Sequence, residues 1–209
     1  MAWRKILVFI TALLFLGVFI LFKLVASQKG PQSIDVTCPL FGDPKAPVEL
    51  VIFEDFKCYA CRLFSKDVLP HILSDYVDTK KVRLKVVPLA FLNGSKPLAN
   101  AAIEVCQLSS DHFFDYAKKL FAHFEFTEVD ESTETVLLEL AKEVGGIDLK
   151  QLKLCIETKC HYKELDQNLA KAKALMGKAL RIPALFINGV RINALDYEEI
   201  QEEIRRAAQ

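Results

Sequence analysis

The sequence predicts an α/β domain with an inserted helical subdomain, preceded by one N-terminal transmembrane helix. Three observations carry this prediction. β-Branched apolar runs lie near both ends of the main body of the chain, and a long stretch between them repeats its apolar residues with a helical period. An unbroken apolar run also occupies Ile6–Phe22. Without this leading segment, the chain suits one domain that carries an inserted subdomain.

Residues 1–26 are predicted to be a membrane anchor or a signal segment. Arg4 and Lys5 precede the apolar run, whose length of about 17 residues gives a helix of roughly 25 Å, enough for a bilayer core. The small residues Val25-Ala26-Ser27 would suit a signal peptidase, but the run is longer than most signal-peptide cores, which favours an uncleaved anchor. Both alternatives export the body of the protein.

Residues 27–47 are predicted to be a linker and entry loop, with a short strand at Ile34–Thr37. A buried strand follows at Val48–Phe53, where the residues are apolar and partly β-branched. The next apolar residues fall at helical spacing from Cys58 to Tyr76, and Pro70 should kink this helix without ending it.

After a second strand at Val82–Leu89, a helical insertion is expected at about residues 96–176. Its apolar stripes predict the helices Leu98–Leu108, Phe113–Phe126, Thr133–Val144 and Leu149–Met176. Asp148 with Gln151 forms a capping box at the start of the last of these helices.

The C-terminal part is predicted to be a β-hairpin followed by a helix. Residues 182–192 form two apolar runs joined by Asn188-Gly189, a strong hairpin signal. Asp196 with Glu199 then caps an amphipathic helix. The order of elements is therefore strand, helix, strand, helical block, hairpin, helix.

The composition narrows the function. The chain has 27 basic and 27 acidic side chains, and this balance argues against a nucleic-acid partner, because nucleic-acid binders usually carry a basic surplus. Nothing in the sequence indicates an organic cofactor. Six cysteines permit disulfides without proving any, and disulfides persist outside the reducing cytosol.

Cys58 and Cys61 form a Cys-x-x-Cys pair, with Tyr59 and Ala60 between them, at the start of the predicted helix. The first sulfur lies beside unpaired backbone N–H groups and the positive end of the helix dipole, which favours its thiolate. The thiolate is the reactive form, and a second sulfur one turn further on can resolve a mixed disulfide. We therefore predict Cys58 as the nucleophile and Cys61 as the resolving thiol of a thiol–disulfide oxidoreductase.

Two other interpretations of the pair remain open. It can form a purely structural disulfide, or it can hold zinc in a site completed by Cys155, Cys160 or His161. The position after a buried strand, the predicted export and a proline ahead of the C-terminal hairpin favour redox chemistry without a metal.

At these residues the chain resembles the thioredoxin superfamily, and within it the DsbA-like oxidoreductases of bacterial envelopes, including membrane-anchored, cysteine-rich members such as the chlamydial ones. The resemblance covers the chain from about Ala46 to its end. It rests on residues 48–61, on Val87-Pro88-Leu89, on the helical insertion and on Ile182-Pro183. It implies a thioredoxin-like domain at residues 48–209.

The resemblance also implies how substrates bind and which partners act. Pro183 is expected to be cis and to face Cys58, and the backbone of Ile182 to pair with an extended substrate. Expected partners are exported proteins that bear thiols or disulfides, together with a membrane redox partner. The protein is expected to be a monomer that acts at the periplasmic or extracytoplasmic face of the inner membrane.

Departures from the family pattern lower the expected oxidising strength. Tyr59-Ala60 offers no histidine to stabilise the thiolate, and Ile182 precedes the proline where strong oxidases often have valine. Ile52 stands where many members have a buried acid. Glu54 or Asp55 could assist proton transfer in its place, but the favoured expectation is that both are surface charges. A weakly oxidising disulfide-forming oxidase is therefore predicted, with an envelope thiol reductase as the alternative.

The remaining cysteines are assigned from their spacing and from the predicted export. Cys155 and Cys160 would point apart on a continuous helix, but a break between two helices brings them within disulfide range. We predict a structural Cys155–Cys160 disulfide. Cys106 is expected to be a buried thiol, and Cys38 either to be unbonded or to pair with Cys106.

Overall fold

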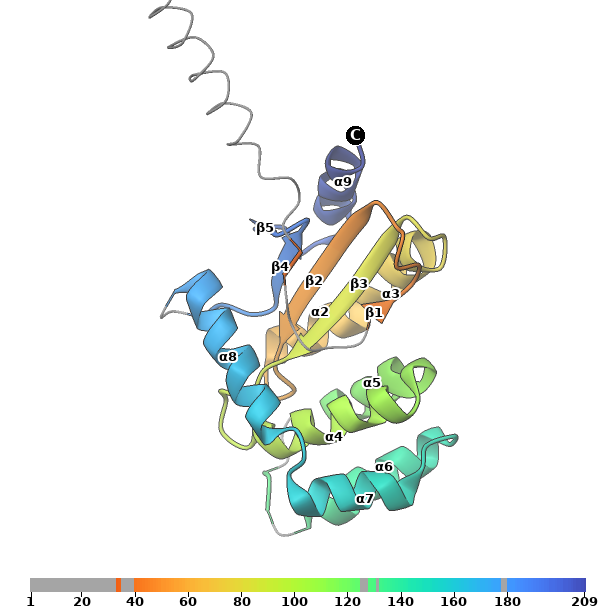
Figure 1. Ribbon diagram of the computed structural model, residues 1–209, viewed down its shortest axis with the longest axis vertical. Coiled ribbons are helices and arrows are strands. Elements are labelled where there is room, and N and C mark those ends of the chain that lie inside the picture. The colour runs from red at the N-terminus through yellow and green to blue at the C-terminus, as the bar shows by residue number, and fades with distance from the viewer. Residues whose placement is uncertain (1–32, 35–39, 125–127, 131, 178–179) are drawn as a thin grey trace, which may run out of the picture. The chain divides into compact units, whose positions relative to one another are not determined.

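Five strands form one mixed sheet at the centre of the domain (Figure 1). They are β1 (Leu40–Phe41), β2 (Val48–Glu54), β3 (Val82–Pro88), β4 (Ala184–Ile187) and β5 (Val190–Ile192). Their order is β1-β3-β2-β4-β5; β2 and β3 are parallel, and the other neighbours are antiparallel. The two predicted long strands and the predicted hairpin are confirmed.

The computed structural model describes residues 33–34, 40–124, 128–130, 132–177 and 180–209. Within those ranges, no helix has the length and apolar character that a membrane span requires. The predicted anchor or signal segment at residues 1–26 lies outside the described residues, as does most of the strand expected at Ile34–Thr37.

Three short helices connect the parallel strands β2 and β3. They are α2 (Tyr59–Asp67), α3 (Leu69–Ile72) and the π-helix η1 (Leu73–Val77). The predicted continuous helix is interrupted at Val68, two residues before Pro70, which occupies the first turn of α3. Proline has no N–H to continue the helical ladder and its ring crowds the preceding turn, so the predicted kink becomes a division into separate helices.

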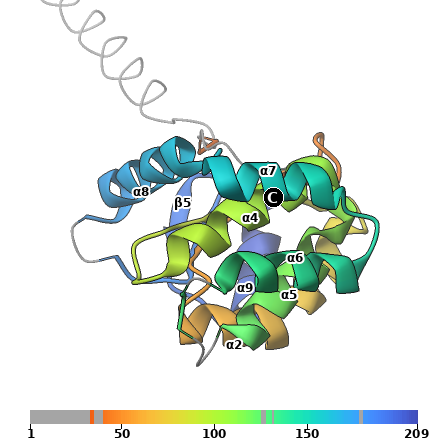
Figure 2. The same cartoon turned by 90° about the horizontal axis from the view of Figure 1, so that it is seen from below.

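The helical insertion lies between β3 and β4. Its elements are α4 (Ser95–Leu108), η2 (Ser110–His112), α5 (Phe113–His123), α6 (Thr133–Val144), α7 (Leu149–Thr158) and α8 (Tyr162–Met176). Helices α4, α5, α6 and α7 pack against one another (Figure 2). The single helix expected over Leu149–Met176 is divided, because Lys159 adopts a left-handed conformation with φ 55° and ends α7.

The chain ends with the hairpin β4–β5 and helix α9 (Tyr197–Ala207). Asn188 and Gly189 have φ values of 48° and 80°, as a tight type I′ turn requires. The carboxylate of Asp196 accepts a hydrogen bond from the N–H of Glu199 at 2.9 Å, so the predicted N-terminal cap of this helix is confirmed.

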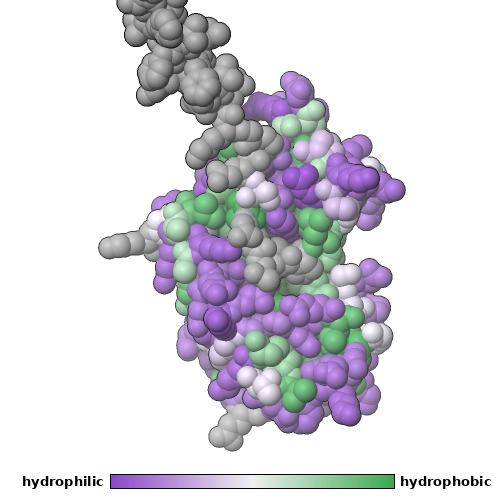
Figure 3. Space-filling model, viewed as in Figure 1, coloured by the Kyte–Doolittle hydropathy of each residue, from purple (hydrophilic) through white to green (hydrophobic). Residues whose placement is uncertain are grey.

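Both faces of the sheet are buried. Leu50 and Ile52 of β2 point into the larger core, which also contains residues of α2, α9 and the insertion. The alternate residues Val51 and Phe53 point to the opposite face, where Ala172 of α8 contributes to a smaller core. The face of the molecule drawn in Figure 3 is largely hydrophilic over the helical insertion, with hydrophobic side chains only in small patches.

Candidate active site

The candidate site lies at the edge of the sheet where β2 and β3 end and β4 begins. Glu54 is the last residue of β2 and pairs with Pro88 of β3. On the other side, Phe53 pairs with Ala184, so the antiparallel register brings Pro183 next to the end of β2. The chain leaves β2 at this edge and enters α2 a few residues later, and segments far apart in sequence therefore meet around Cys58.

Cys58 is the N-terminal cap of α2 and has an extended backbone conformation. Its half-buried sulfur accepts a hydrogen bond from the N–H of Cys61 at 3.3 Å and lies 3.8 Å from the carbonyl oxygen of Ile182. The pKa of Cys58 is lowered to about 7, chiefly by a hydrogen bond from the Cys61 thiol and further by backbone N–H groups of Cys61 and Ala60. Burial opposes this shift but does not cancel it.

Cys61 lies one turn into α2 and is completely buried. Burial raises the pKa of its thiol strongly, and the neighbouring Cys58 raises it further. The two sulfurs therefore differ at neutral pH, because Cys58 is poised to ionise while Cys61 keeps its proton and donates it in a hydrogen bond. The assignment of nucleophile and resolving thiol remains a prediction, and these opposite shifts support it.

The Ile182–Pro183 peptide bond is cis, and Pro183 is buried. The carbonyl group of Ile182 faces the Cys58 sulfur. Tyr59 and Ala60, the residues between the cysteines, are both exposed, and the guanidinium of Arg62 lies 5.2 Å from the centre of the Tyr59 ring. Cys58 is thus bordered by an exposed aromatic side chain and by the backbone that precedes Pro183.

The expectation that Asp55 is a surface charge is wrong. Its carboxylate is fully buried and accepts hydrogen bonds from the N–H groups of Lys57, Phe91 and Leu92 and from the hydroxyl of Ser95. Burial raises the pKa of Asp55, and these four hydrogen bonds only partly offset the shift. Asp55 thereby holds the segment before Cys58 against the start of α4.

The same expectation is wrong for Glu54, which is only 2% exposed. Its Oε2 atom accepts no hydrogen bond from the described residues. Burial, followed by the nearby Cys58 and Asp55, raises the pKa of Glu54 to about 8. Because side chains alternate along a strand, Glu54 shares a face with Ile52, the position at which the family pattern has its buried acid. The sequence signal for this acid was a glutamate at the end of a mostly apolar strand.

The other predicted site residues lie in the helical insertion. Cys155 and Cys160 form a disulfide with their Cα atoms 4.9 Å apart. Among the described residues, these two cysteines and His161 cluster with Glu104 and not with the Cys58–Cys61 pair, which contradicts a zinc site shared between them. Cys106 is buried, and Cys38 lies outside the described residues.

A thioredoxin-like sheet, two thiols with opposite pKa shifts and a cis proline beside the ionising thiol define a thiol–disulfide oxidoreductase. Comparison with known proteins supports this class. The family model described as Thioredoxin matches residues 35–206. The chain therefore belongs to the thioredoxin family.

The chain is also similar to a relative named for disulfide bond formation and to solved structures of this family. The chain is 34% identical over 172 residues to disulfide bond formation protein D of Bacillus subtilis, covering 80% of this chain and 76% of that protein. The DsbA structure of Chlamydia trachomatis matches with a TM-score of 0.73 at 28% identity, covering 84% of this chain and 93% of that one.

A second structure, oxidised BdbD from Bacillus subtilis, matches with a TM-score of 0.72 at 29% identity and covers 82% of this chain and 92% of that one. Together these matches confirm the predicted DsbA-like thioredoxin fold with its helical insertion. They also confirm the predicted enzyme class, protein thiol–disulfide oxidoreductase.

Proposed function

We propose that the protein is a weakly oxidising disulfide-forming oxidase that transfers the Cys58–Cys61 disulfide to thiol-bearing proteins. A substrate thiolate attacks the Cys58 sulfur, and Cys61 leaves as a thiolate that takes up a proton. A second substrate thiolate then attacks the substrate sulfur of the mixed disulfide, and Cys58 leaves as a thiolate. The substrate loses two electrons and gains a disulfide, while the enzyme pair becomes a dithiol.

The lowered pKa of Cys58, about 7, is the observation that carries the weak character of this oxidase, and the relatives named disulfide bond formation protein support its oxidising direction. A thiol of lower pKa leaves more readily and stabilises the reduced enzyme, which drives substrate oxidation. The value lies near the ~7 of thioredoxin and well above the ~3.5 of the strong oxidant DsbA. The pKa of Cys58 is not lowered further because neutral hydrogen-bond donors, and no charged histidine, stabilise its thiolate.

An extracytoplasmic setting and extended protein substrates follow from the same proposal. The exposed ring of Tyr59 and the backbone before Pro183 border Cys58 on two sides, an arrangement that suits an extended segment with a thiol. The relatives named disulfide bond formation protein support an oxidase that acts on exported proteins. Residues 1–26 would tether the monomeric enzyme to the membrane, where a redox partner reoxidises it.

The alternative direction is that of an envelope thiol reductase, which the thioredoxin-like pKa of Cys58 also allows. The equilibrium redox potential of the Cys58–Cys61 couple in glutathione buffers separates the two directions. We expect a potential between those of thioredoxin, ~−270 mV, and DsbA, ~−120 mV. A value at the thioredoxin end contradicts the oxidase, and one at the DsbA end contradicts its weak character. Cys155→Ser/Cys160→Ser protein should be measured in parallel to exclude a contribution from the second disulfide.

A further inference from the structure

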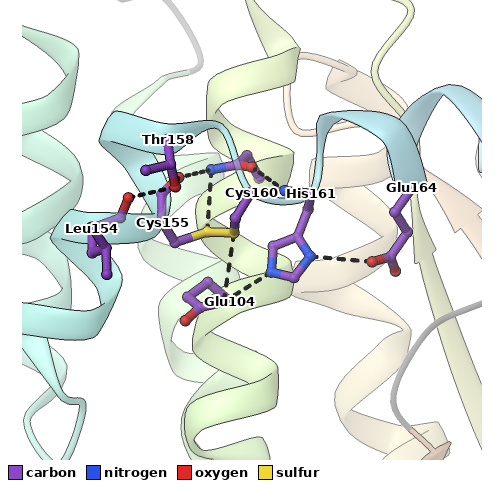
Figure 4. Close-up of a disulfide and its surroundings, with 8 residues drawn as sticks. Glu104, Leu154, Cys155, Thr158, Cys160, His161 and Glu164 are labelled. Carbon is purple, nitrogen blue, oxygen red and sulfur yellow. Dashed lines mark hydrogen bonds and ion pairs between the residues drawn. A yellow bond between two sulfur atoms is a disulfide. The ribbon is translucent and has the colours of Figure 1, made fainter.

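A second group of reactive side chains lies in the helical insertion, at the turn between α7 and α8 (Figure 4). Glu104 comes from α4, Cys155 from the last turn of α7, and Cys160 and His161 from the turn itself. One ligand-type atom from each of these four residues lies within 4.8 Å of all the others. Among the described residues this is the one group of its kind, and the oxidase chemistry uses none of its members.

His161 lies between two carboxylates. Its Nε2 atom is 2.9 Å from Oε2 of Glu104, and its Nδ1 atom is 3.1 Å from Oε2 of Glu164. A neutral imidazole has a single N–H, so it can donate to only one of the two. When Glu164 accepts the Nδ1 hydrogen, the lone pair of Nε2 faces Glu104. Histidines that bind metals commonly donate their other ring hydrogen to a carboxylate in this way.

Asn100 of α4 holds the turn in place from the buried side. It is only 1% exposed; its Oδ1 accepts the N–H of His161 at 2.9 Å, and its Nδ2 donates to the carbonyl oxygen of Cys155 at 3.3 Å. The same Nδ2 lies 3.6 Å from the Cys155 sulfur. The Asn100 amide thus holds the backbone at Cys155 and at His161, the two ends of the turn. It also offers a hydrogen-bond donor to the Cys155 sulfur once that sulfur is a thiolate.

We propose that Glu104, Cys155, Cys160 and His161 form a redox-gated zinc site. With the Cys155–Cys160 disulfide intact, neither sulfur is a thiolate, and the group lacks two of its four ligands. After reduction it offers two thiolates, one imidazole nitrogen and one carboxylate oxygen, a donor set that suits tetrahedral Zn²⁺. The thiolates select zinc over magnesium or calcium, which prefer oxygen ligands.

The reductant is a dithiol, either a small molecule or a protein. Its thiolate attacks the exposed sulfur of Cys160, and Cys155 leaves with the electron pair of the broken bond. The second thiolate of the reductant then displaces Cys160, so the reductant ends as a disulfide and the turn as two thiols. Binding of one Zn²⁺ releases the two thiol protons. The metal replaces the lost disulfide as the link between the two ends of the turn and also ties them to α4.

The test uses the full chain in detergent, with Cys58→Ser and Cys61→Ser substitutions so that the catalytic pair cannot bind metal. After reduction and removal of the reductant, Zn²⁺ is titrated against a chromophoric chelator, and Co²⁺ is added to a second sample. We expect one metal ion per chain in the reduced protein and none in the oxidised protein. Co²⁺ should give thiolate charge-transfer bands and the visible spectrum of a tetrahedral site. Absence of binding by the reduced protein overturns the proposal.

Variants then identify the ligands. In the same background, Cys155→Ser/Cys160→Ser should abolish binding, and His161→Gln or Glu104→Gln should weaken it by about tenfold or more. His161→Gln retains the backbone hydrogen bond to Asn100, which helps the variant to fold. His71→Gln removes an exposed histidine outside the cluster and should bind like the background. Full affinity in the His161→Gln protein, or zinc retained without Cys155 and Cys160, contradicts the site.

Discussion

Two sulfurs three positions apart acquire different chemistry because one caps a helix and the other is buried inside it. The Cys58 sulfur accepts the N–H of Cys61, whereas Cys61 has no exposed surface. Hydrogen bonds to a charged form stabilise it, and burial disfavours it. At the residue scale, local hydrogen bonding and burial therefore make the two thiols differ in pKa, without any charged residue between the cysteines.

Substitution of the two cysteines should separate their roles. Cys58→Ser should abolish dithiol-driven reduction of insulin, because the attacking sulfur is lost. Cys61→Ser should accumulate mixed disulfides with a disulfide-bearing substrate, because the Cys58 thiolate attacks the substrate disulfide, releases one substrate thiol, and has no second enzyme thiol to resolve the product. Non-reducing electrophoresis detects these species. His71→Gln serves as the control and should retain activity. Insulin reduction by Cys58→Ser protein would remove Cys58 from the nucleophile role.

The buried Glu54 should make the stability of the reduced protein fall as the pH rises. Its pKa is about 8 in the folded protein against 4.5 for the ordinary group, so the folded state binds more protons between these values. Stability is then lost as the pH increases, by at most about 1.4 kcal/mol per pH unit. Glu54→Gln cannot ionise and should lack this contribution. Urea unfolding between about pH 5 and pH 8 measures the difference.

A suitable control for this experiment is Glu198→Gln, which removes an exposed carboxylate of α9. It should keep the pH dependence of the unmodified protein. If Glu54→Gln and the unmodified protein lose stability equally with rising pH, Glu54 is ionised in the folded state and its pKa is not raised.

At the scale of elements, the turn between α7 and α8 shows how one backbone conformation changes the chemistry of a segment. Lys159 ends α7 in a left-handed conformation, and the N–H of Cys160 bonds to the carbonyl oxygen of Cys155 at 3.1 Å. On a continuous helix these two side chains would point apart. The turn redirects the chain and brings both sulfurs against α4, where Asn100 contacts Cys155 and Glu104 contacts Cys160.

Removal of the second disulfide should destabilise the domain only modestly, because it closes a short loop. The cysteines are 5 positions apart. The chain-entropy relation gives about 2 kcal/mol for a loop of this size. Cys155→Ser/Cys160→Ser should therefore lower the free energy of unfolding by about 2 kcal/mol in denaturant titrations with a metal chelator present. Addition of a reductant should destabilise the unmodified protein by a similar amount. Equal unfolding midpoints would show that the bridge adds no stability.

At the scale of the whole molecule, the domain buries its apolar side chains in its own core, whereas the predicted tether would bury them in a membrane. The domain buries both faces of its sheet and exposes a largely hydrophilic surface on the face in Figure 3. Residues 1–26 contain an apolar run that could not be left in water without cost. A membrane tether would keep the Cys58–Cys61 pair near a membrane redox partner.

The anchor prediction has a direct test. Full-length protein should remain in the membrane pellet after a carbonate wash, and its intact mass should include residues 1–26. Leu14→Arg places a charge in the middle of the apolar run, at a cost of about 3 kcal/mol for insertion, and should shift the protein toward the soluble fraction. A mature protein that begins near Ser27 would favour the cleaved signal peptide.

The sequence by itself determined most of the elements and the reactive pair. The long strands β2 and β3, most of the insertion helices, the Asn188-Gly189 hairpin and the helix start after Cys58 all depend on contacts between residues a few positions apart. Periodicity, caps and turn residues report such contacts directly. The short strand β1 and the divisions of the helices predicted over residues 58–76 and 149–176 were not predicted. The family resemblance added the position of Pro183, which spacing alone does not supply.

Only the tertiary structure decided what surrounds the reactive groups. Asp55 binds N–H groups 36 and 37 positions away, His161 meets Glu104 across 57 positions, and Cys58 faces Ile182 across 124. A carboxylate at the end of a strand looks the same in sequence whether it is exposed or buried. Its burial depends on which distant segments the sheet and the insertion pack against it, and that burial sets the pKa values of the site.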